Sequence, residues 1–156
     1  MNSMGLTSEE LALLQKNTQR GKLLEVLQGT TGVGMPVKIA VVKCNGNAWN
    51  FVAFHEGKIA GLRRVDRKNG EVVLSPAEFT ATPQNLGIGS ALTAEALKRS
   101  AALKPRQVLI ESFYNDRWKK HLVEKLGGTE SEGGGVVWER KSNFGGRTFE
   151  RHLLRK

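Results

Sequence analysis

The part of the sequence best suited to chemistry is a glycine-rich turn between a predicted strand and a predicted helix. Residues 83–92 read PQNLGIGSAL, so Gly87 and Gly89 are separated by one residue. Glycines at this spacing let the backbone turn sharply and expose successive N–H groups, which together with a helix N-terminus form a site for a pyrophosphate. Leu92 replaces the third glycine of a dinucleotide fingerprint, and the absence of Gly-Lys-Ser/Thr excludes a P-loop. A tight turn without a ligand explains the two glycines equally well.

The elements predicted around this turn form a mixed arrangement of strands and helices. Strand-like runs separated by glycine-containing turns precede it and favour an antiparallel meander; they cover residues 37–43, 48–55, 59–65 and 71–82. Apolar residues at helical spacing then predict a helix over 87–103. The remaining elements are a strand, a helix and two further strands, over 107–113, 115–126, 136–142 and 147–154. Because a helix joins the fourth and fifth strands, these two strands are expected to be parallel.

The first part of the chain predicts helix. Thr7 and Glu10 have the spacing of a capping box, and leucines follow at helical intervals. We therefore expect one broken helix or two short helices over residues 8–28, and then a flexible Gly-rich loop. The expected organisation is an N-terminal helical segment with its loop over 1–34 and a second unit over 35–156.

Composition excludes several classes of protein. The 156 residues are 39% hydrophobic and 25% charged, which is typical of a soluble globular domain and not of a disordered chain. No apolar run is long enough to cross a bilayer, and the single cysteine, Cys44, cannot form an intramolecular disulfide. The three histidines lie far apart, so neither a zinc nor a haem site is expected. These features favour a reducing, cytoplasmic setting without a membrane partner.

The net charge of +9 favours anionic partners. Such partners are nucleic acid, an acidic protein surface or a phosphate-rich cofactor, although a basic surface also serves solubility alone. The tightest group of cations is opposed only by Asp66; it consists of Arg63, Arg64, Arg67 and Lys68. This group is the expected surface for nucleic acid or protein.

Features in order along the chain resemble the GNAT superfamily, the Gcn5-related N-acetyltransferases. Gln84-x-x-Gly87-x-Gly89 resembles the Q/R-x-x-G-x-G/A motif of that family. Residues 108–110 followed by Asn115 resemble its next strand and the Asn that begins the next helix. Residues 126–128, LGG, resemble the end of that helix, although a glycine replaces the family's final aromatic residue. The resemblance covers roughly residues 48–156 and implies a GNAT-like α/β (α+β) fold, with a mixed, mostly antiparallel sheet and a β-α-β cofactor-binding core.

The resemblance implies acetyl-CoA as the cofactor and indicates which residues would hold it. Backbone amides of the turn that follows Gln84 would bind the pyrophosphate of coenzyme A; they belong to Leu86, Gly87, Ile88, Gly89, Ser90 and Ala91. The strand before the turn would pair with the pantetheine arm through Phe79, Thr80 and Ala81. Asn115 would contact the cofactor, or it is an ordinary helix N-cap.

The implied reaction moves an acetyl group from a thioester to a primary amine. A base must take the proton of the amine, and Glu78 is the candidate nearest the acetyl position, with Glu71 and Glu111 as alternatives. A backbone N–H of Thr80 or Ala81 would stabilise the oxyanion. Holding the amine and the thioester together in a dry cleft would supply much of the rate.

The sequence departs from the family pattern at two places, the general acid and the wall of the acceptor site. The family's tyrosine acid corresponds to Val123, so Tyr114 or His121 would protonate the leaving thiolate. In most members a helix pair between the first and second strands walls the acceptor site, whereas here the helical segment precedes all predicted strands. Either the helices have moved in the chain, or the true first strand is hidden before residue 35.

We therefore expect an acetyl-CoA-dependent N-acetyltransferase whose acceptor is linked to nucleic acid, such as aminoacyl-tRNA, or is an anionic protein. The positive charge argues against cationic acceptors such as polyamines. The second expectation is a GNAT-like module without catalysis that binds nucleic acid or protein through its basic surface. The third is a purely structural domain, and the oligomeric state stays open, a dimer included.

Overall fold

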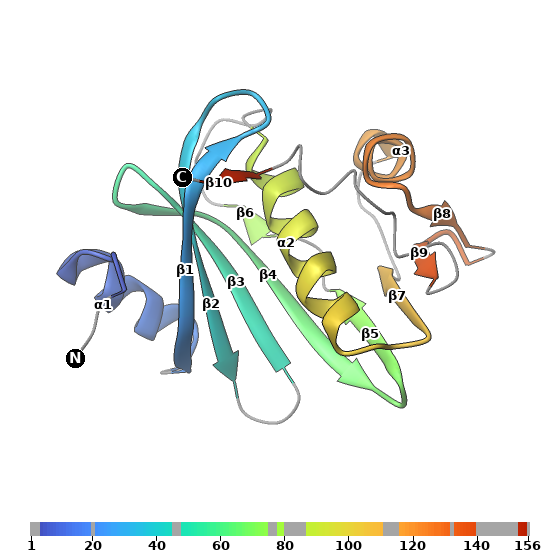
Figure 1. Cartoon of the computed structure of the whole chain (residues 1–156), viewed down its shortest axis with the longest axis horizontal. Coiled ribbons are helices and arrows are strands. Elements are labelled where there is room, and N and C mark those ends of the chain that lie inside the picture. The colour runs from blue at the N-terminus through green and yellow to red at the C-terminus, as the bar shows by residue number, and fades with distance from the viewer. Residues whose placement is uncertain are drawn as a thin grey trace.

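The structure, a computed structural model of the chain, describes residues 4–19, 21–44, 48–74, 78–79, 87–110, 116–131, 133–139 and 153–155. The helices within these ranges are α1 (Ser8–Asn17), α2 (Ile88–Ala102) and α3 (Asp116–Leu126). The strands are β1 (Lys22–Thr31), β2 (Pro36–Cys44), β3 (Ala48–His55), β4 (Lys58–Lys68), β5 (Glu71–Leu74), β6 (Glu78–Phe79), β7 (Gln107–Ile110), β8 (Thr129–Glu130), β9 (Val136–Glu139) and β10 (Leu153–Arg155). All of these strands belong to one sheet (Figure 1).

The sheet is mixed and mostly antiparallel, as the sequence predicts. Its strand order is β10-β1-β2-β3-β4-β5-β7-β9-β8, and β6 also pairs with β4. Among the pairs of described strands, only β5 and β7 are parallel, with Val72 opposite Val108 and Val73 opposite Leu109. Helix α2 lies between these two strands in the chain, so the prediction of a parallel pair around a helix is confirmed.

One helix covers each face of the long strands. Helix α2 packs against β3 and β4 over a core that includes Phe51 and Val65, and we call this side the α2 face (Figure 1). On the opposite side, the α1 face, Leu14 of the first helix belongs to a cluster with Val42 and Phe54. Because β3 is covered on both faces, nearly all of its residues are buried rather than every second one.

The N-terminal helix is shorter than predicted. The capping box is present: the Thr7 side chain accepts from the Glu10 N–H at 3.1 Å, and the Glu10 carboxylate accepts from the Thr7 N–H at 2.9 Å. The prediction of helix as far as residue 28 is wrong, because residues 22–31 form β1 inside the sheet, between β2 and β10. The strand hidden before residue 35 is therefore real.

A bulge explains why β1 looks helical in the sequence. Its pairing with β2 shifts between Leu23 and Glu25, which breaks the alternation of a regular strand. Leu23 packs on the α1 face, whereas Leu24 and Leu27 pack on the α2 face. Apolar residues spaced by one and by three positions imitate a helical period.

The last strands also pair differently from the prediction. Strand β9 confirms the start of the run predicted over 136–142, and it pairs with β7 and with the short β8. The family that the sequence resembles ends in a strand hairpin, which predicts that the strands over 136–142 and 147–154 pair with each other. This prediction is wrong for the described residues, since β10 lies at the other end of the sheet and pairs with β1. Within the fourth predicted strand, 71–82, residues 71–74 form β5 and residues 78–79 form β6, and the others lie outside the described residues. The predicted continuation of β7 through residues 111–113 lies outside the described residues.

Helices in the described ranges lack the length and apolar character that a membrane crossing needs. A search of the same ranges gives no group of three or more His, Cys, Asp or Glu residues that could hold a metal ion. Cys44 is a half-buried free thiol whose sulfur accepts a hydrogen bond from the Asn50 side chain at 3.0 Å.

Candidate cofactor site at the start of α2

The candidate site lies where the sheet pairing changes after β5. The parallel pairing of β5 with β7 extends to Val73 and Leu109. Strand β6 pairs instead with β4, where Phe79 is opposite Gly61. Helix α2 begins shortly after this point and runs back over the sheet to β7. Ligand sites in α/β sheets favour such points, beyond the carboxyl ends of strands that separate.

The N-terminus of α2 carries no cap from its own side chains. Gly87 is the N-cap residue in the left-handed conformation, with φ 80° and ψ 5°, and it makes no side-chain hydrogen bond. The first helical hydrogen bond runs from the Ala91 N–H to the Gly87 carbonyl at 3.0 Å, so the N–H groups of residues 88–90 have no partner within the helix. The first turn contains no acidic residue. The positive end of the helix dipole is therefore suited to an external anion.

Gly87 also has a packing role. A Cβ at this position would lie 3.0 Å from both Cβ and Oγ1 of Thr31 and 3.5 Å from Cγ2 of Val33. These residues belong to the turn between β1 and β2, where the Thr31 hydroxyl accepts from the Met35 N–H at 3.2 Å. The structure thus accounts for a glycine at 87 without a ligand, because both its φ angle and its contact with the β1–β2 hairpin require one.

A serine–histidine contact joins α3 to the start of α2. Ser90 Oγ lies 2.7 Å from Nε2 of His121, at hydrogen-bond distance, and Ser90 is buried whereas His121 is half-buried. Because Ser90 is in the first turn of α2, this contact ties His121 of α3 to the start of α2. The sequence suggested His121 as an acid but gave no indication of its partner, since 31 residues separate the two.

The structure places part of the predicted site. Residues 87–91, whose amides were predicted to bind the pyrophosphate, form the N-cap and first turn of α2. Glu78 and Phe79 form β6, with Glu78 opposite Leu62 in the pairing with β4. The other predicted site residues lie outside the described residues: Thr80, Ala81, Gln84, Leu86, Tyr114 and Asn115.

The predicted cluster of cations is not one surface. Arg63 is fully buried, and burial lowers its pKa to about 10, so it stays charged at neutral pH. Arg64 is exposed and contacts Asp66 through hydrogen bonds of 3.1–3.3 Å, which raise the pKa of Arg64. Arg67 is exposed and lies two residues beyond the buried Val65, on the α2 face. The expected common surface of Arg63, Arg64, Arg67 and Lys68 is therefore wrong for the three arginines, and the side chain of Lys68 lies outside the described part of the structure.

Comparisons with known proteins bear on the fold. No protein-family model matches the sequence, and no curated protein matches it either. Among solved structures, spermidine N-acetyltransferase from Vibrio cholerae is 15% identical, with a TM-score of 0.52 over 64% of this chain and 68% of that one. The ribosomal-protein-S18-alanine N-acetyltransferase from Escherichia coli is 18% identical, with a TM-score of 0.50 over 60% of this chain and 68% of that one. Both likenesses are of fold, and the fold of this chain is that of the Gcn5-related N-acetyltransferases.

Proposed function

We propose that this protein is an acetyl-CoA-dependent N-acetyltransferase that holds the diphosphate of its coenzyme at the start of α2. The observation that carries the proposal is the N-terminus of this helix, which has neither a side-chain cap nor an acidic first turn. It stands after β6 in a fold shared with solved N-acetyltransferases. Packing against the β1–β2 hairpin accounts for glycine at 87, but it does not account for a first turn without Asp or Glu, which the helix dipole would favour there.

The residues present fit a diphosphate. The N–H groups of Ile88, Gly89 and Ser90 have no helical partner, and they point out of the helix end together with its dipole. We assign Gln84 and the amides of Leu86 and Gly87 to the same site, with Asn115 as a further contact. The predicted role of the Ala91 amide is wrong, because this N–H donates to the Gly87 carbonyl within the helix. Strand residues Phe79, Thr80 and Ala81 are assigned to the pantetheine arm, as an added strand would use them.

The coenzyme would supply the acetyl group as a thioester. The chain must then take a proton from the acceptor amine, stabilise an oxyanion and protonate a thiolate. We assign the first task to Glu78 and the second to a backbone N–H of Thr80 or Ala81. Tyr114 is our first candidate for the third task. His121 is the alternative, because its contact with Ser90 keeps it beside the start of α2.

The acceptor is proposed from charge. The two solved relatives described above are named for spermidine and for the alanine of ribosomal protein S18. A net charge of +9 repels a polyamine and attracts an anionic acceptor, so we favour an amine carried by nucleic acid, such as aminoacyl-tRNA, or by an anionic protein. The free thiol of Cys44 fits a reducing, cytoplasmic setting.

Thermal unfolding with and without acetyl-CoA tests the binding step. Acetyl-CoA at about 100 times its dissociation constant should stabilise the protein by about 2.7 kcal/mol, which raises Tm by roughly 5–10 °C for a chain of this size. Gly89→Asp places a carboxylate in the first turn, where it favours the helix dipole but repels a diphosphate. This variant should fold and lose the shift, whereas Gly89→Asn should keep most of it. An unchanged shift in Gly89→Asp would remove α2 from the site.

Release of free coenzyme A thiol in the presence of candidate acceptors tests catalysis. Glu78→Gln should keep the acetyl-CoA shift and slow thiol release, and unchanged turnover would remove Glu78 from the role of base. A protein that binds acetyl-CoA but acetylates neither pooled aminoacyl-tRNA nor lysate proteins would instead be a binding module. The basic surface favours this second candidate function.

A further inference from the structure

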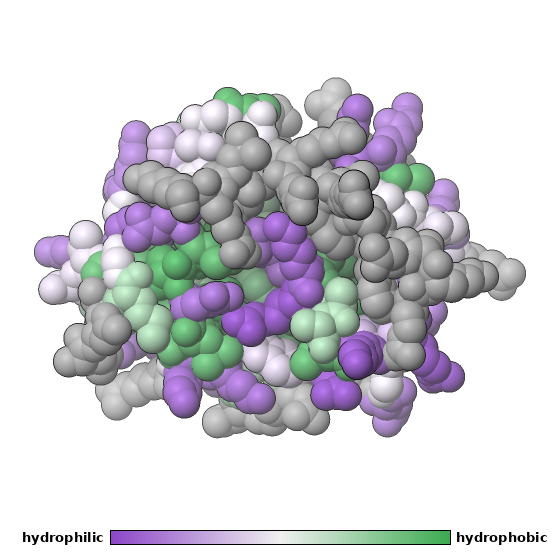
Figure 2. Space-filling model, viewed as in Figure 1, coloured by the Kyte–Doolittle hydropathy of each residue, from purple (hydrophilic) through white to green (hydrophobic). Residues whose placement is uncertain are grey.

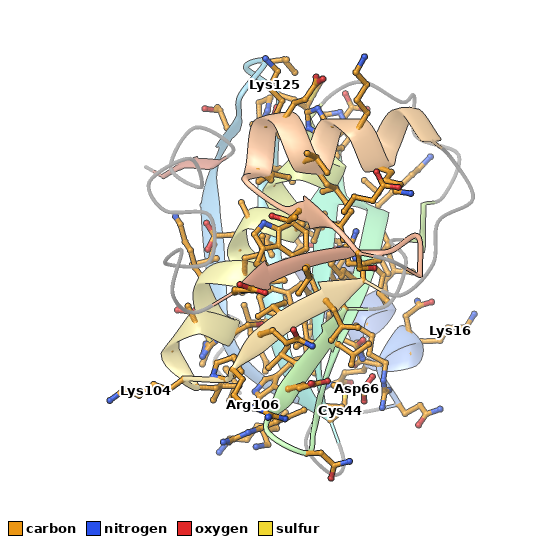
Figure 3. The ribbon with its side chains drawn as sticks, turned by 90° about the vertical axis from the view of Figure 1, so that its right-hand side faces the viewer. Lys16, Cys44, Asp66, Lys104, Arg106 and Lys125 are labelled. Atoms are coloured by element: carbon orange, nitrogen blue, oxygen red, sulfur yellow. The ribbon has the colours of Figure 1, made fainter. Side chains whose placement is uncertain are left out.

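A group of exposed cations surrounds the C-terminal end of α2, at the opposite end of the helix from Gly87. These residues are Lys22, Lys43, Arg67, Lys104 and Arg106, and the half-buried Lys98 and Arg99 of α2 lie among them. Figure 3 shows Lys104 and Arg106 at the lower end of the molecule, far from Lys125 on α3. Since α2 is 15 residues long, its two ends are about 22 Å apart. We call this group the basic end.

The cations from the sheet lie on the same face as α2. Val42 faces the α1 side of the sheet, so the next residue, Lys43, faces the α2 side. The Lys43 Nζ lies 4.7 Å from the centre of the Trp49 ring, which also packs on the α2 face. Lys22 is directly opposite Lys43 in the pairing of β1 with β2. Arg67 shares its face with Val65. From β1 to β7 the strand order contains five steps, so the cations span about 24 Å of the sheet.

The pairing of Lys22 with Lys43 is unfavourable for folding. Like charges directly opposite each other in an antiparallel sheet destabilise it. Lys43 gains a contact with Trp49, but Lys22 is exposed at the first position of its strand. The positive charge at this position is therefore better explained by a ligand than by the stability of the sheet.

A hollow lies beside these cations, between β1 and the end of α2. It has a volume of about 220 Å³ and lies over the buried side chains of Leu27, Val41 and Phe51, with charged side chains of β1 and α2 around it. Glu25 and Arg99 form an ion pair of 3.0 Å between the strand and the helix at its edge. Figure 2 shows the α2 face of the molecule. In the middle of this face a band of hydrophilic side chains has hydrophobic side chains on both sides.

The carboxylates of the hollow distinguish between anionic partners. Glu25 and Glu95 both line it, and Glu95 is buried and accepts from Lys98 at 3.4 Å. Each of these carboxylates already pairs with a cation of α2, Glu25 with Arg99 and Glu95 with Lys98, so the hollow has no net charge to attract the carboxylates of an acidic peptide. A nucleic acid base has no charge, has an apolar face, and in adenine and cytosine has an exocyclic amino group that donates to a carboxylate.

We propose that the basic end binds single-stranded nucleic acid, with phosphates along the exposed cations and a base over the hollow. The proposal stands on charge and geometry and does not depend on acetyl transfer. Phosphate contacts by lysine and arginine supply affinity through release of counterions. A base held over the hollow, with its amino group toward Glu25, supplies a preference among bases.

Fluorescence anisotropy with labelled RNA 12-mers, without coenzyme, tests the phosphate contacts. With about five contacts, affinity should fall about 100-fold between 50 and 200 mM salt, because each contact contributes about 0.7 to the slope of log K against log salt. Lys22→Gln combined with Arg67→Gln should make this slope less steep by about 1.4. The same variant should melt at the wild-type temperature or above it, since Lys22→Gln removes the repulsion with Lys43.

A matched control makes the same change of net charge elsewhere. Lys16 on α1 and Lys120 on α3 are both exposed, and Lys16→Gln combined with Lys120→Gln should leave the slope unchanged. Equal slopes for the two double variants would overturn the proposal. A polyglutamate that displaces the RNA as well as unlabelled RNA does would overturn nucleic acid as the partner.

The binding of RNA homopolymers tests whether the hollow recognises a base. Oligo-adenylate and oligo-cytidylate should bind more tightly than oligo-uridylate, whose base has no exocyclic amino group. Glu25→Ala should remove this preference without making the salt dependence less steep, because it also releases Arg99 from its ion pair. Equal affinity of the wild-type protein for all three RNAs would overturn the role of the hollow in base recognition.

Discussion

The indole of Trp138 lies where a side chain at Gly128 would have to be. A Cβ on Gly128 would stand 3.0 Å from two atoms of the Trp138 ring and would overlap Cγ1 of Val136. Trp138 is completely buried, and its Nε1 donates to the Leu126 carbonyl at 2.8 Å, which ties β9 to the end of α3. Trp138 of β9 therefore leaves room for only a glycine at position 128.

Gly128→Ala is expected to destabilise the protein by about 1–3 kcal/mol, because a methyl group has no room between Val136 and Trp138. Urea unfolding followed by tryptophan fluorescence measures the change. Gly133→Ala is the matched control, since a Cβ there would meet nothing within 4 Å. If both variants lose the same stability, the contact with Trp138 is not the cause.

Gly87→Ala tests how much of the glycine turn serves packing. The left-handed φ of 80° costs an alanine about 1–2 kcal/mol, and the 3.0 Å approach to Thr31 adds to this. Gly57 has nearly the same φ, 78°, with nothing near its Cβ, so Gly57→Ala measures the backbone contribution alone. The free energy of unfolding should fall more for Gly87→Ala, and equal losses would mean that Thr31 moves aside without cost.

The Ser90–His121 contact is expected to link α3 to the cofactor site. Ser90→Ala and His121→Ala should each destabilise by about 1 kcal/mol, and the double variant should lose less than the sum of the two. Both single variants should also weaken acetyl-CoA binding, because Ser90 stands in the first turn of α2. Calorimetric titration measures this second effect. Additive losses in stability would show that the two side chains do not interact.

The lowered pKa of Glu10 predicts that the stability of the fold depends on pH in the acidic range. Burial alone raises the pKa of this carboxyl, but the hydrogen bonds from the Thr7 N–H and from Lys38 outweigh it and bring the pKa below its usual 4.5. Since the folded value is lower than the unfolded one, the stabilisation is fully present above about pH 4.5–5 and is lost as the pH falls through the folded pKa.

Glu10→Gln keeps an acceptor for the capping box but removes the charge opposite Lys38, whose Nζ lies 2.9 Å from the carboxylate. The variant should be less stable than the wild type by about 0.5–1 kcal/mol at neutral pH. This difference should shrink below pH 4.5, as urea unfolding at a series of pH values will show. A difference that stays constant down to pH 2 would contradict the assignment.

The central part of the fold is predictable because its patterns are local. Helix α2 follows from apolar residues at helical spacing and from the glycines before it, and the strands β2 to β4 follow from short turns between β-rich runs. The capping box at Thr7 and Glu10 likewise involves residues three positions apart. Such features do not depend on distant parts of the chain.

The errors concern pairings between distant residues. Strand β1 was mistaken for helix because a bulge at Leu23–Glu25 interrupts its alternation, and β10 joins β1 from more than 100 residues away. The burial of Arg63 has a visible indication in the sequence, since it shares a strand face with Val65. The Ser90–His121 contact has none, because the two residues are 31 positions apart and belong to different helices.

Thr31 connects the last strand to the start of α2. Its backbone pairs with Leu153 of β10. Its side chain packs so closely against Gly87 that a Cβ at position 87 would lie only 3.0 Å away. A label fused directly after β10, or proteolysis within it, would loosen the tip of the β1–β2 hairpin and with it the support of the helix that we assign to the coenzyme. Tags for purification are therefore safer at the α1 side of the molecule.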